Sequence, residues 1–337
     1  MERGEAMIQA KETGNSRLHD INQETYMGTI PILAKERLYS FRDVGLSAAG
    51  FGIASWCYVQ GAFLAAHVRF PISLMLCVVP VMLISLFVML LVIIPARFGV
   101  DLWMYQRAVF GHRFAFILCI TALLITWGWY AINCGVFAGS IVKLGQFAGA
   151  DLGWGTRLFS ACCAVLGLLL AIKGPYQVKR ATYVMVPALI VVGIILLIEV
   201  LAQTDLGELS SFQPIYKDQY PTAQIAFLCT AEAMVAFVFG WYPALGGLSR
   251  LAKTERGSYW GHVLGYGFAM CVFTMIGCVC STLISGRFGY FTSNPADWLA
   301  ALSGPVWAVI AILIIVVANI TTQMTGVYCL SMAVKVF

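Results

Sequence analysis

The fold is decided by the stretch GFGIASWCYVQG at residues 50–61, which has a counterpart, GWYPALGG, at residues 240–247. Both stretches interrupt long apolar segments with glycine or proline, and these residues loosen the hydrogen-bond ladder of a helix. Inside a bilayer, a loosened backbone persists only where protein or a water-filled cavity satisfies its freed polar groups. Two such interruptions at corresponding places in one chain are typical of a membrane transporter site.

The composition is that of a membrane protein. Hydrophobic residues make up 60% of the 337-residue chain and charged residues only 11%, against about 25% charged residues in soluble domains. Since about 20 apolar residues cross the hydrocarbon, the uncharged segments predict eight spans. We expect these spans near residues 43–67, 70–96, 114–143, 157–173, 180–202, 221–247, 257–286 and 300–335.

Basic residues are distributed by side of the membrane, which argues against nucleic acid as the reason for the formal charge of +5. The N-terminal tail through Arg42 and the loops 97–113, 173–180 and 250–256 together hold fifteen Lys and Arg residues. The opposite loops hold four, namely Arg69, Arg157, Lys217 and Arg287. The positive-inside rule therefore places the N-terminus in the cytoplasm, with residues 1–42 as a cytoplasmic tail.

The eleven cysteines lie within or beside apolar spans, without a CxxC pair or histidines at metal-ligand spacing. We interpret them as small buried packing residues, and we predict neither a cofactor nor a metal site beyond a candidate Na⁺.

The two interruptions are five spans apart, and five is an odd number, so spans 1 and 6 run in opposite directions. This arrangement indicates an all-α polytopic protein with an inverted five-helix repeat. Residues 43–203 would form the first repeat and residues 219–337 part of the second. Because two more spans would be needed to complete the pair, we expect the chain to be a fragment of a longer protein.

Span 3 carries Trp129 and Asn133, which share one helix face at mid-membrane depth. An indole beside an amide suits a planar heterocycle, since the ring stacks and the amide pairs with polar atoms. Alternatively, the amide makes an interhelical hydrogen bond next to a packed tryptophan.

Span 8 contains a cluster of oxygen-bearing side chains, from which we single out Thr321 and Thr322. Hydroxyls facing the freed carbonyls of a broken helix can bind a monovalent cation without a carboxylate. Threonines that simply pack, or that bond to their own helix, are the alternative.

Glu232 is the only acidic residue deep inside a span. Because a carboxylate there is costly to insert, we expect it to face the bundle or a cavity, either as a proton site or as a structural carboxyl group. No catalytic signature occurs in a usable context, so the sequence does not support an enzyme.

The chain resembles the nucleobase:cation symporter-1 family of cytosine, purine, allantoin and hydantoin permeases. The resemblance covers most of residues 40–330 and is carried by an ordered set of motifs. These are Arg97-Phe98-Gly99-Val100-Asp101, Arg107-Ala108-Val109-Phe110-Gly111, Gly128-Trp129-Tyr130, Ser249-Arg250-Leu251-Ala252-Lys253 and Ile320-Thr321-Thr322-Gln323.

The resemblance implies a leucine-transporter-like bundle, with about eight of the usual 10–12 helices present here. It also implies a substrate site between spans 1, 3, 6 and 8. The implied substrate-binding residues are Trp129, Asn133, Gln60 and Trp241. The implied cation-binding residues are Trp56, Val59, Ala318, Thr321 and Thr322.

The sequence departs from the family at two places. Gly247 stands where members often carry an acidic residue, and Val327 stands near a substrate-binding asparagine of some members. We therefore expect a symporter that imports a nucleobase or related heterocycle with Na⁺ or H⁺ by alternating access, in a bacterial inner membrane or plasma membrane. A channel or a non-transporting sensor on the same fold is the alternative. The oligomeric state is left open.

Overall fold

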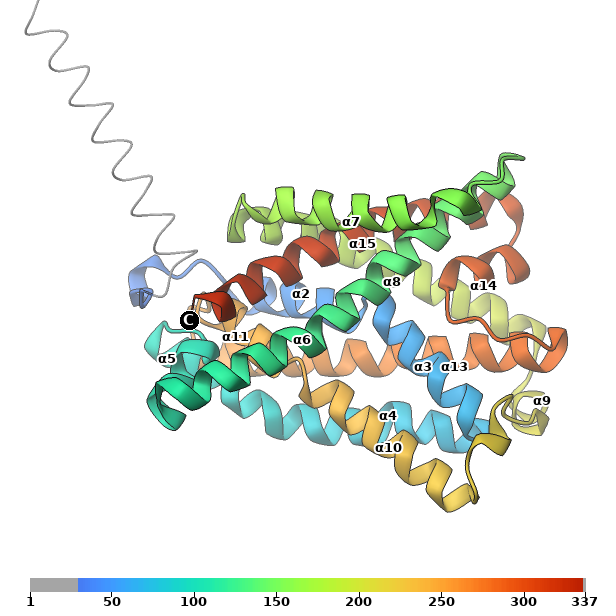
Figure 1. The fold of residues 1–337 in the computed structure, drawn as a ribbon, viewed down its shortest axis with the longest axis horizontal. Helices are drawn as coiled ribbons and strands as arrows, with labels where there is room; N and C mark the ends of the chain where they lie inside the picture. The colour runs from blue at the N-terminus through green and yellow to red at the C-terminus, as the bar shows by residue number, and fades with distance from the viewer. Residues whose placement is uncertain (1–29, 336–337) are drawn as a thin grey trace, which may run out of the picture.

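The computed structural model describes residues 30–335, of which 84% are helical and none lies in a β-strand. One isolated bridge pairs Tyr39 with Ala252. Residues 1–29 of the expected cytoplasmic tail lie outside the described residues. The helices form one elongated bundle in which most of them run roughly along its long axis (Figure 1).

The helices follow the predicted spans. Span 1 is α2 (Phe41–Gly52) with α3 (Ser55–His67); span 2 is α4 (Phe70–Val88), η2 (Met89–Val92) and α5 (Ile93–Phe98); spans 3, 4 and 5 are α6 (Leu102–Phe147), α7 (Thr156–Ala171) and α8 (Pro175–Gln203). Span 6 is α10 (Ala223–Phe239) with α11 (Tyr242–Ser249); span 7 is α12 (Glu255–His262), the π-helical η5 (Val263–Phe268) and α13 (Ala269–Phe288); span 8 is α15 (Pro305–Val334). Short helices lie outside the spans: η1 (Ala34–Glu36), η3 (Gly153–Gly155), α9 (Leu206–Ser211), η4 (Lys217–Gln219) and α14 (Pro295–Leu302).

Within residues 30–335, seven helices are long and apolar enough to cross a membrane, and the bent pair α2 and α3 makes an eighth span. The chain is therefore a multi-pass membrane protein. The two sequence interruptions differ in the structure. The first bends span 1 by 46°, whereas the second separates α10 from α11 within a single continuous 27-residue span.

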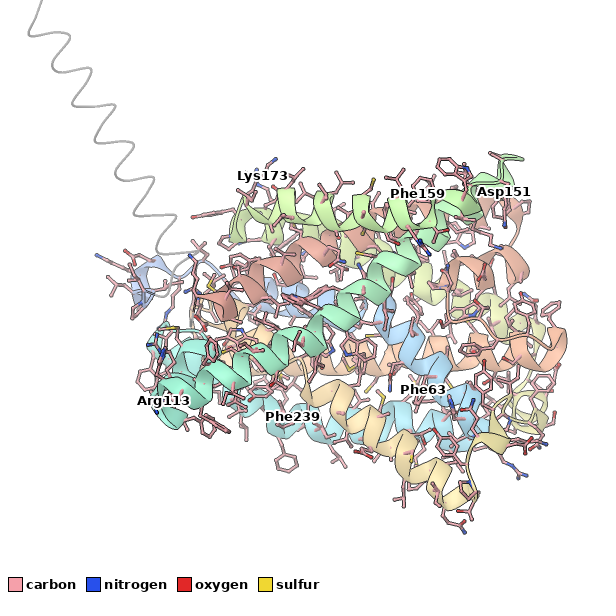
Figure 2. The ribbon with its side chains drawn as sticks, viewed as in Figure 1. Phe63, Arg113, Asp151, Phe159, Lys173 and Phe239 are labelled. Carbon is pink, nitrogen blue, oxygen red and sulfur yellow. The ribbon has the colours of Figure 1, made fainter. Side chains whose placement is uncertain are left out.

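The two ends of the bundle differ in charge. Arg113 and Lys173 lie at one end and Asp151 at the other (Figure 2). The loops 97–101 and 250–254 also meet at the first end, where Arg97 forms an ion pair of 2.8 Å with Glu255. We call this the basic end.

Span 1 packs tightly against span 7 because glycines line the contact. A Cβ atom at Gly61 would overlap the carbonyl oxygen of Thr274, and one at Gly277 would overlap that of Tyr58. Such close approach is available only to residues without a side chain. Gly265 in η5 similarly meets the backbone of Gly45 in α2. Both halves of the bent span are thus held against one continuous neighbour.

Candidate functional site

The bend in span 1 frees backbone groups at the centre of the bundle. Helix α2 ends at Gly52, and Ala54, with extended backbone angles, precedes α3. A Cβ atom at Gly52 would lie 2.7 Å from the carbonyl oxygen of Tyr266, so the bend presses directly against span 7. The indole N–H of Trp56 donates to Phe51 O at 2.9 Å and satisfies one freed carbonyl.

A stack of two indoles joins the interruptions of spans 1 and 6. The rings of Trp56 and Trp241 lie 4.4 Å apart at an interplanar angle of 22°, and both side chains are buried. Tyr130 of α6 meets both rings edge-on, at 5.6 and 6.0 Å. This aromatic stack fills the middle of the bundle between spans 1, 3 and 6.

Beside the stack is a cavity of about 360 Å³, which we call the central cavity. Pockets for small ligands are typically about 300–1,000 Å³. Its walls come from α3, α6 and the α10–α11 junction. The lining residues are Gln60, Phe63, Ile125, Thr126, Trp129, Ala233, Ala236, Phe237, Gly240 and Trp241. On α3 these residues follow the bend, whereas on α6 they precede Tyr130.

The central cavity combines aromatic surface with one unpaired donor. Trp129 and Phe237 are 4.8 Å apart at an angle of 54°. The Nε2 atom of buried Gln60 has no hydrogen-bond partner within residues 30–335. The hydroxyl of Thr126 is occupied because it donates to Ala122 O. Gln60 is thus the one amide among the residues that line this cavity, and its Nε2 is enclosed by protein atoms.

Asn133 lies elsewhere, although it was expected beside Trp129 in the site. Its side chain is fully buried, and Nδ2 donates to Asn319 O at 3.0 Å. The Oδ1 atom of Asn319 in turn accepts from the hydroxyl of Ser55, directly after the bend. Asn133 therefore contributes to a polar network between spans 3, 8 and 1, and it does not line the central cavity.

A second, much smaller cavity lies between spans 1, 5 and 8. Its volume is about 10 Å³, close to that of one water-sized sphere. We call it the threonine cavity. It is lined by Gly50, Ile53, Thr182, Met185, Val186, Leu189, Thr321, Thr322 and Thr325.

The threonine cavity includes two of the five expected cation-binding residues, Thr321 and Thr322. Ala318 is not among the lining residues, although its carbonyl accepts from the Thr321 hydroxyl at 2.9 Å. Trp56 and Val59 do not line it either. Trp56 takes part in the aromatic stack instead.

The oxygen atoms around the threonine cavity suit a small monovalent cation. The lining has hydroxyls and backbone but no carboxylate, and hard cations prefer oxygen ligands. The Thr182 hydroxyl is already engaged, since it donates to Val178 O and Lys179 O, each at 3.0 Å. A hydroxyl that donates its hydrogen still offers lone pairs. Groups of His, Cys, Asp or Glu able to hold a metal ion are absent from residues 30–335.

Glu232 lines neither cavity, and its expected orientation toward the bundle or a cavity stays a prediction. Its side chain lies on the exposed face of α10, together with exposed Leu228 and Val235. The sequence reveals its depth in span 6, but the rotation of that helix is set by packing. No hydrogen bond or ion pair holds Glu232 within the described part of the chain.

Sequence reasoning missed Phe237, Gly50 and Ile53. A signal for Phe237 was present, because it lies one helical turn before Trp241 and shares its face. Gly50 and Ile53 are three residues apart, at the end of the half-helix before the bend. What the sequence did not show was the residue at which α2 ends.

Contacts of two buried residues, Tyr39 and Asp101, hold the basic end of the bundle together. Tyr39 pairs with the loop after span 6 through backbone bonds to Leu251 O and from Lys253 N, at 2.9 and 2.8 Å. Burial raises the pKa of the Tyr39 hydroxyl well above its ordinary value. Asp101 is also buried, and it caps α6 by accepting from Met104 N at 3.0 Å. Burial raises the pKa of Asp101, while the nearby positive charge of Arg250 opposes that rise.

The sequence of the chain matches one family of membrane permeases. The family model described as permease for cytosine/purines, uracil, thiamine and allantoin matches residues 45–334. No curated protein matches the chain.

Two solved structures have a similar fold. One is Mhp1, a nucleobase-cation-symport-1 family transporter, in a closed conformation with bromovinylhydantoin bound; its TM-score is 0.69 at 15% identity, covering 88% of this chain and 66% of that one. The other is the inward-facing conformation of Mhp1, with a TM-score of 0.66 at 16% identity, covering 89% and 64%. The chain thus spans about two thirds of their length. The likeness shows the fold, and it confirms the expected transporter bundle.

Proposed function

The chain belongs to the family of permeases for cytosine/purines, uracil, thiamine and allantoin, and from this we propose that it is a symporter for a nucleobase or a related planar heterocycle. The observation that carries the proposal is the central cavity, in which Trp129 and Phe237 offer aromatic surface beside the unpaired amide of Gln60. Mhp1 has bromovinylhydantoin bound in its solved structure, which supports this class of ligand.

The two kinds of contact have different roles. Ring stacking contributes roughly 0.5–1.5 kcal/mol beyond area burial, and every nucleobase has a face that can stack. An unpaired buried amide costs about 1–3 kcal/mol, so a ring that accepts from Gln60 Nε2 gains more than one that cannot. We therefore assign affinity for the ring class to Trp129 and Phe237, and selection among rings to Gln60. Asn133 would act indirectly, by fixing span 3 against span 8.

Na⁺ is the proposed coupling ion, bound in the threonine cavity by Thr321 and Thr322 with backbone near Gly50 and Ile53. Such an ion would connect the half-helix before the bend to span 8. Because the central cavity shares span 1, ion binding and ring binding would influence each other's affinity. Proton coupling through Glu232 has less support, since this residue is exposed and lines neither cavity.

The positive-inside rule supports an orientation with the basic end in the cytoplasm, in a bacterial inner membrane or a plasma membrane. Opening toward the cytoplasm would require the stack and the Tyr39 contacts to part.

The test is equilibrium binding of labelled cytosine, uracil, adenine, hypoxanthine, allantoin and hydantoin to the purified protein, with and without Na⁺. We expect saturable binding of at least one ring, tightened by Na⁺. Trp129→Ala should weaken binding of every bound ring about tenfold or more. Trp127→Ala is the matched control, because Trp127 is an exposed indole on the same helix that does not line the central cavity.

Transport is then tested by counterflow in vesicles containing the protein. Unlabelled ring inside should accelerate uptake of labelled ring if the protein alternates between two states, whereas a pore would show no acceleration. Binding of no ring, or equal losses for Trp129→Ala and Trp127→Ala, would overturn the proposal.

A further inference from the structure

A groove at the basic end lies outside the two cavities described above. It has a volume of about 460 Å³ and runs between the first turn of α2 and the start of span 7. Its lining residues are Phe41, Thr254, Arg256, Gly257, Trp260 and Leu264. We call it the Arg256 groove. Gly257 lies in contact with the first turn of α2, since a Cβ atom at this glycine would lie 3.6 Å from Phe41 Cα, an ordinary van der Waals distance.

The walls of the groove are apolar and open. Phe41, Trp260 and Leu264 are 51%, 42% and 50% exposed. Trp260 and Leu264 are one helical turn apart, and exposed Phe268 continues the same stripe along the span. A stripe of this kind, beginning with an indole at the end of a membrane span, is placed to contact an acyl chain.

The mouth of the groove is positively charged. Exposed Arg256 lines the groove, and exposed Lys253 directly precedes the lining residue Thr254. The acidic neighbour Glu255 does not neutralise them, because its two carboxylate oxygens bind the guanidinium of Arg97, each at 2.8 Å. Thr254 is engaged in capping α12, with its hydroxyl accepting from Gly257 N at 3.1 Å. The groove therefore offers cationic side chains at one end and an apolar track at the other.

We propose that the Arg256 groove binds an anionic glycerophospholipid of the leaflet at the basic end. Its phosphate would contact Arg256 and Lys253, and an acyl chain would lie along Trp260, Leu264 and Phe268. A zwitterionic lipid offers the same chains, but its head group carries a compensating positive charge. A free phosphate offers the charge without the chains. The chemistry of the groove requires both parts in one molecule.

A bound lipid would connect the two helices that form the groove. Phe41 begins the half-helix of span 1 that leads to Gly50 and Ile53, whereas Trp260 belongs to span 7. A lipid that fills the space between them would hold this half-helix against span 7. Anionic lipid should therefore raise the thermal stability of the protein more than zwitterionic lipid does.

The test uses the purified protein in detergent and measures retention of added lipid by native mass spectrometry, together with the thermal unfolding midpoint. The probes are dioleoylphosphatidylglycerol, dioleoylphosphatidylcholine and soluble glycerol 1-phosphate. We expect phosphatidylglycerol to be retained about tenfold better than phosphatidylcholine and to raise the midpoint, and we expect no effect of glycerol 1-phosphate. Equal retention of the two lipids, or stabilisation by glycerol 1-phosphate alone, would overturn the proposal.

Substitutions test whether the preference for anionic lipid arises in the Arg256 groove. Arg256→Gln should remove most of the preference for phosphatidylglycerol, and Arg256→Lys should keep it. Arg113→Gln is the matched control, since Arg113 is an exposed basic residue at the same end of the bundle (Figure 2). If Arg256→Gln and Arg113→Gln lower the preference equally, the cause is diffuse surface charge and the groove is not a site. Trp260→Ala should weaken retention of phosphatidylglycerol while Arg256 is still present, and unchanged retention would contradict the acyl track.

Discussion

At the residue scale, the amides Gln60 and Asn133 lie in different surroundings, although both were expected to bind the substrate. Gln60 lines the central cavity with an unpaired Nε2, whereas Asn133 is buried in contact with the backbone of span 8. Both amides lie in apolar spans, so polarity does not distinguish them. The difference comes from helix rotation, which decides whether a side chain meets a cavity or a neighbouring helix.

Gln60→Leu and Asn133→Leu should therefore have different consequences. Loss of the Gln60 donor should weaken binding of rings that accept from it by roughly 5–10-fold, about 1 kcal/mol or slightly more, with little change in stability. Loss of Asn133 should lower the free energy of unfolding by about 0.5–1.5 kcal/mol, because its hydrogen bond to Asn319 O is lost. Ring binding and thermal unfolding of both variants check this. Equal stability losses, with no change in ring preference for Gln60→Leu, would contradict it.

Two threonine-to-valine variants test the threonine cavity in the same way. Thr322→Val should abolish the tightening of ring binding by Na⁺, since a candidate ligand oxygen is removed. Thr230→Val is the control, because its hydroxyl also donates to two carbonyls of its own helix but Thr230 does not line the cavity. Couplings between sites are typically about 5–150-fold, so ring titrations at low and high Na⁺ can resolve the loss. A Thr322→Val variant that retains the full Na⁺ effect would rule out this cavity as the ion site.

At the element scale, the sequence predicts the eight spans and both interruptions, but not the register of the first bend. The glycines at positions 50 and 52 mark the region, yet the end of α2 is set by its packing against Tyr266 of span 7. Trp56 and Val59 lie six residues beyond Gly50 and Ile53. That shift is more than one and a half turns, enough to move a backbone group out of the threonine cavity. For the same reason, the depth of Glu232 is readable from the sequence and its facing direction is not.

The contact between α2 and span 7 is sensitive to added volume. At Gly265 a Cβ atom would overlap the carbonyl oxygen of Gly45, and at Gly261 it would lie 2.8 Å from Val44 Cγ1. Gly265→Ala should therefore destabilise the protein by about 1–3 kcal/mol through overpacking. Gly135→Ala is the control, since nothing lies within 4 Å of its Cβ position. Thermal unfolding in detergent compares the two, and equal midpoints would show that α2 can move away without cost.

At the scale of the whole molecule, ion pairs connect neighbouring helices at both ends of the bundle. At the end opposite the basic end, the guanidinium of Arg287 on α13 contacts both carboxylate oxygens of Glu208 on α9, each at 2.9 Å. At the basic end, Lys179 of α8 pairs with Asp43 of α2 at 2.9 Å. The first pair holds a loop helix and the second holds the half-helix that leads to the bend.

The Glu208 pair should give the stability a dependence on acid. The hydrogen bonds from Arg287, and then from Thr204, lower the pKa of Glu208 below its ordinary value. Its contribution is therefore present above the unfolded pKa of about 4.3, and it is lost as the pH falls through the lower folded pKa. Glu208→Gln should lower the thermal midpoint near neutral pH and flatten its decline at acidic pH. Parallel midpoint curves for the two proteins between pH 3 and 7 would contradict this role.

The stacked indoles of Trp56 and Trp241 also have an optical consequence. The strong electronic transitions of two indoles 4.4 Å apart and nearly parallel couple with each other, so the circular dichroism of the pair differs from the sum of two isolated rings. One ring comes from each interrupted span. A state in which spans 1 and 6 separate must lose this coupled signal. Circular dichroism therefore reports, without an added label, whether the centre of the bundle is closed.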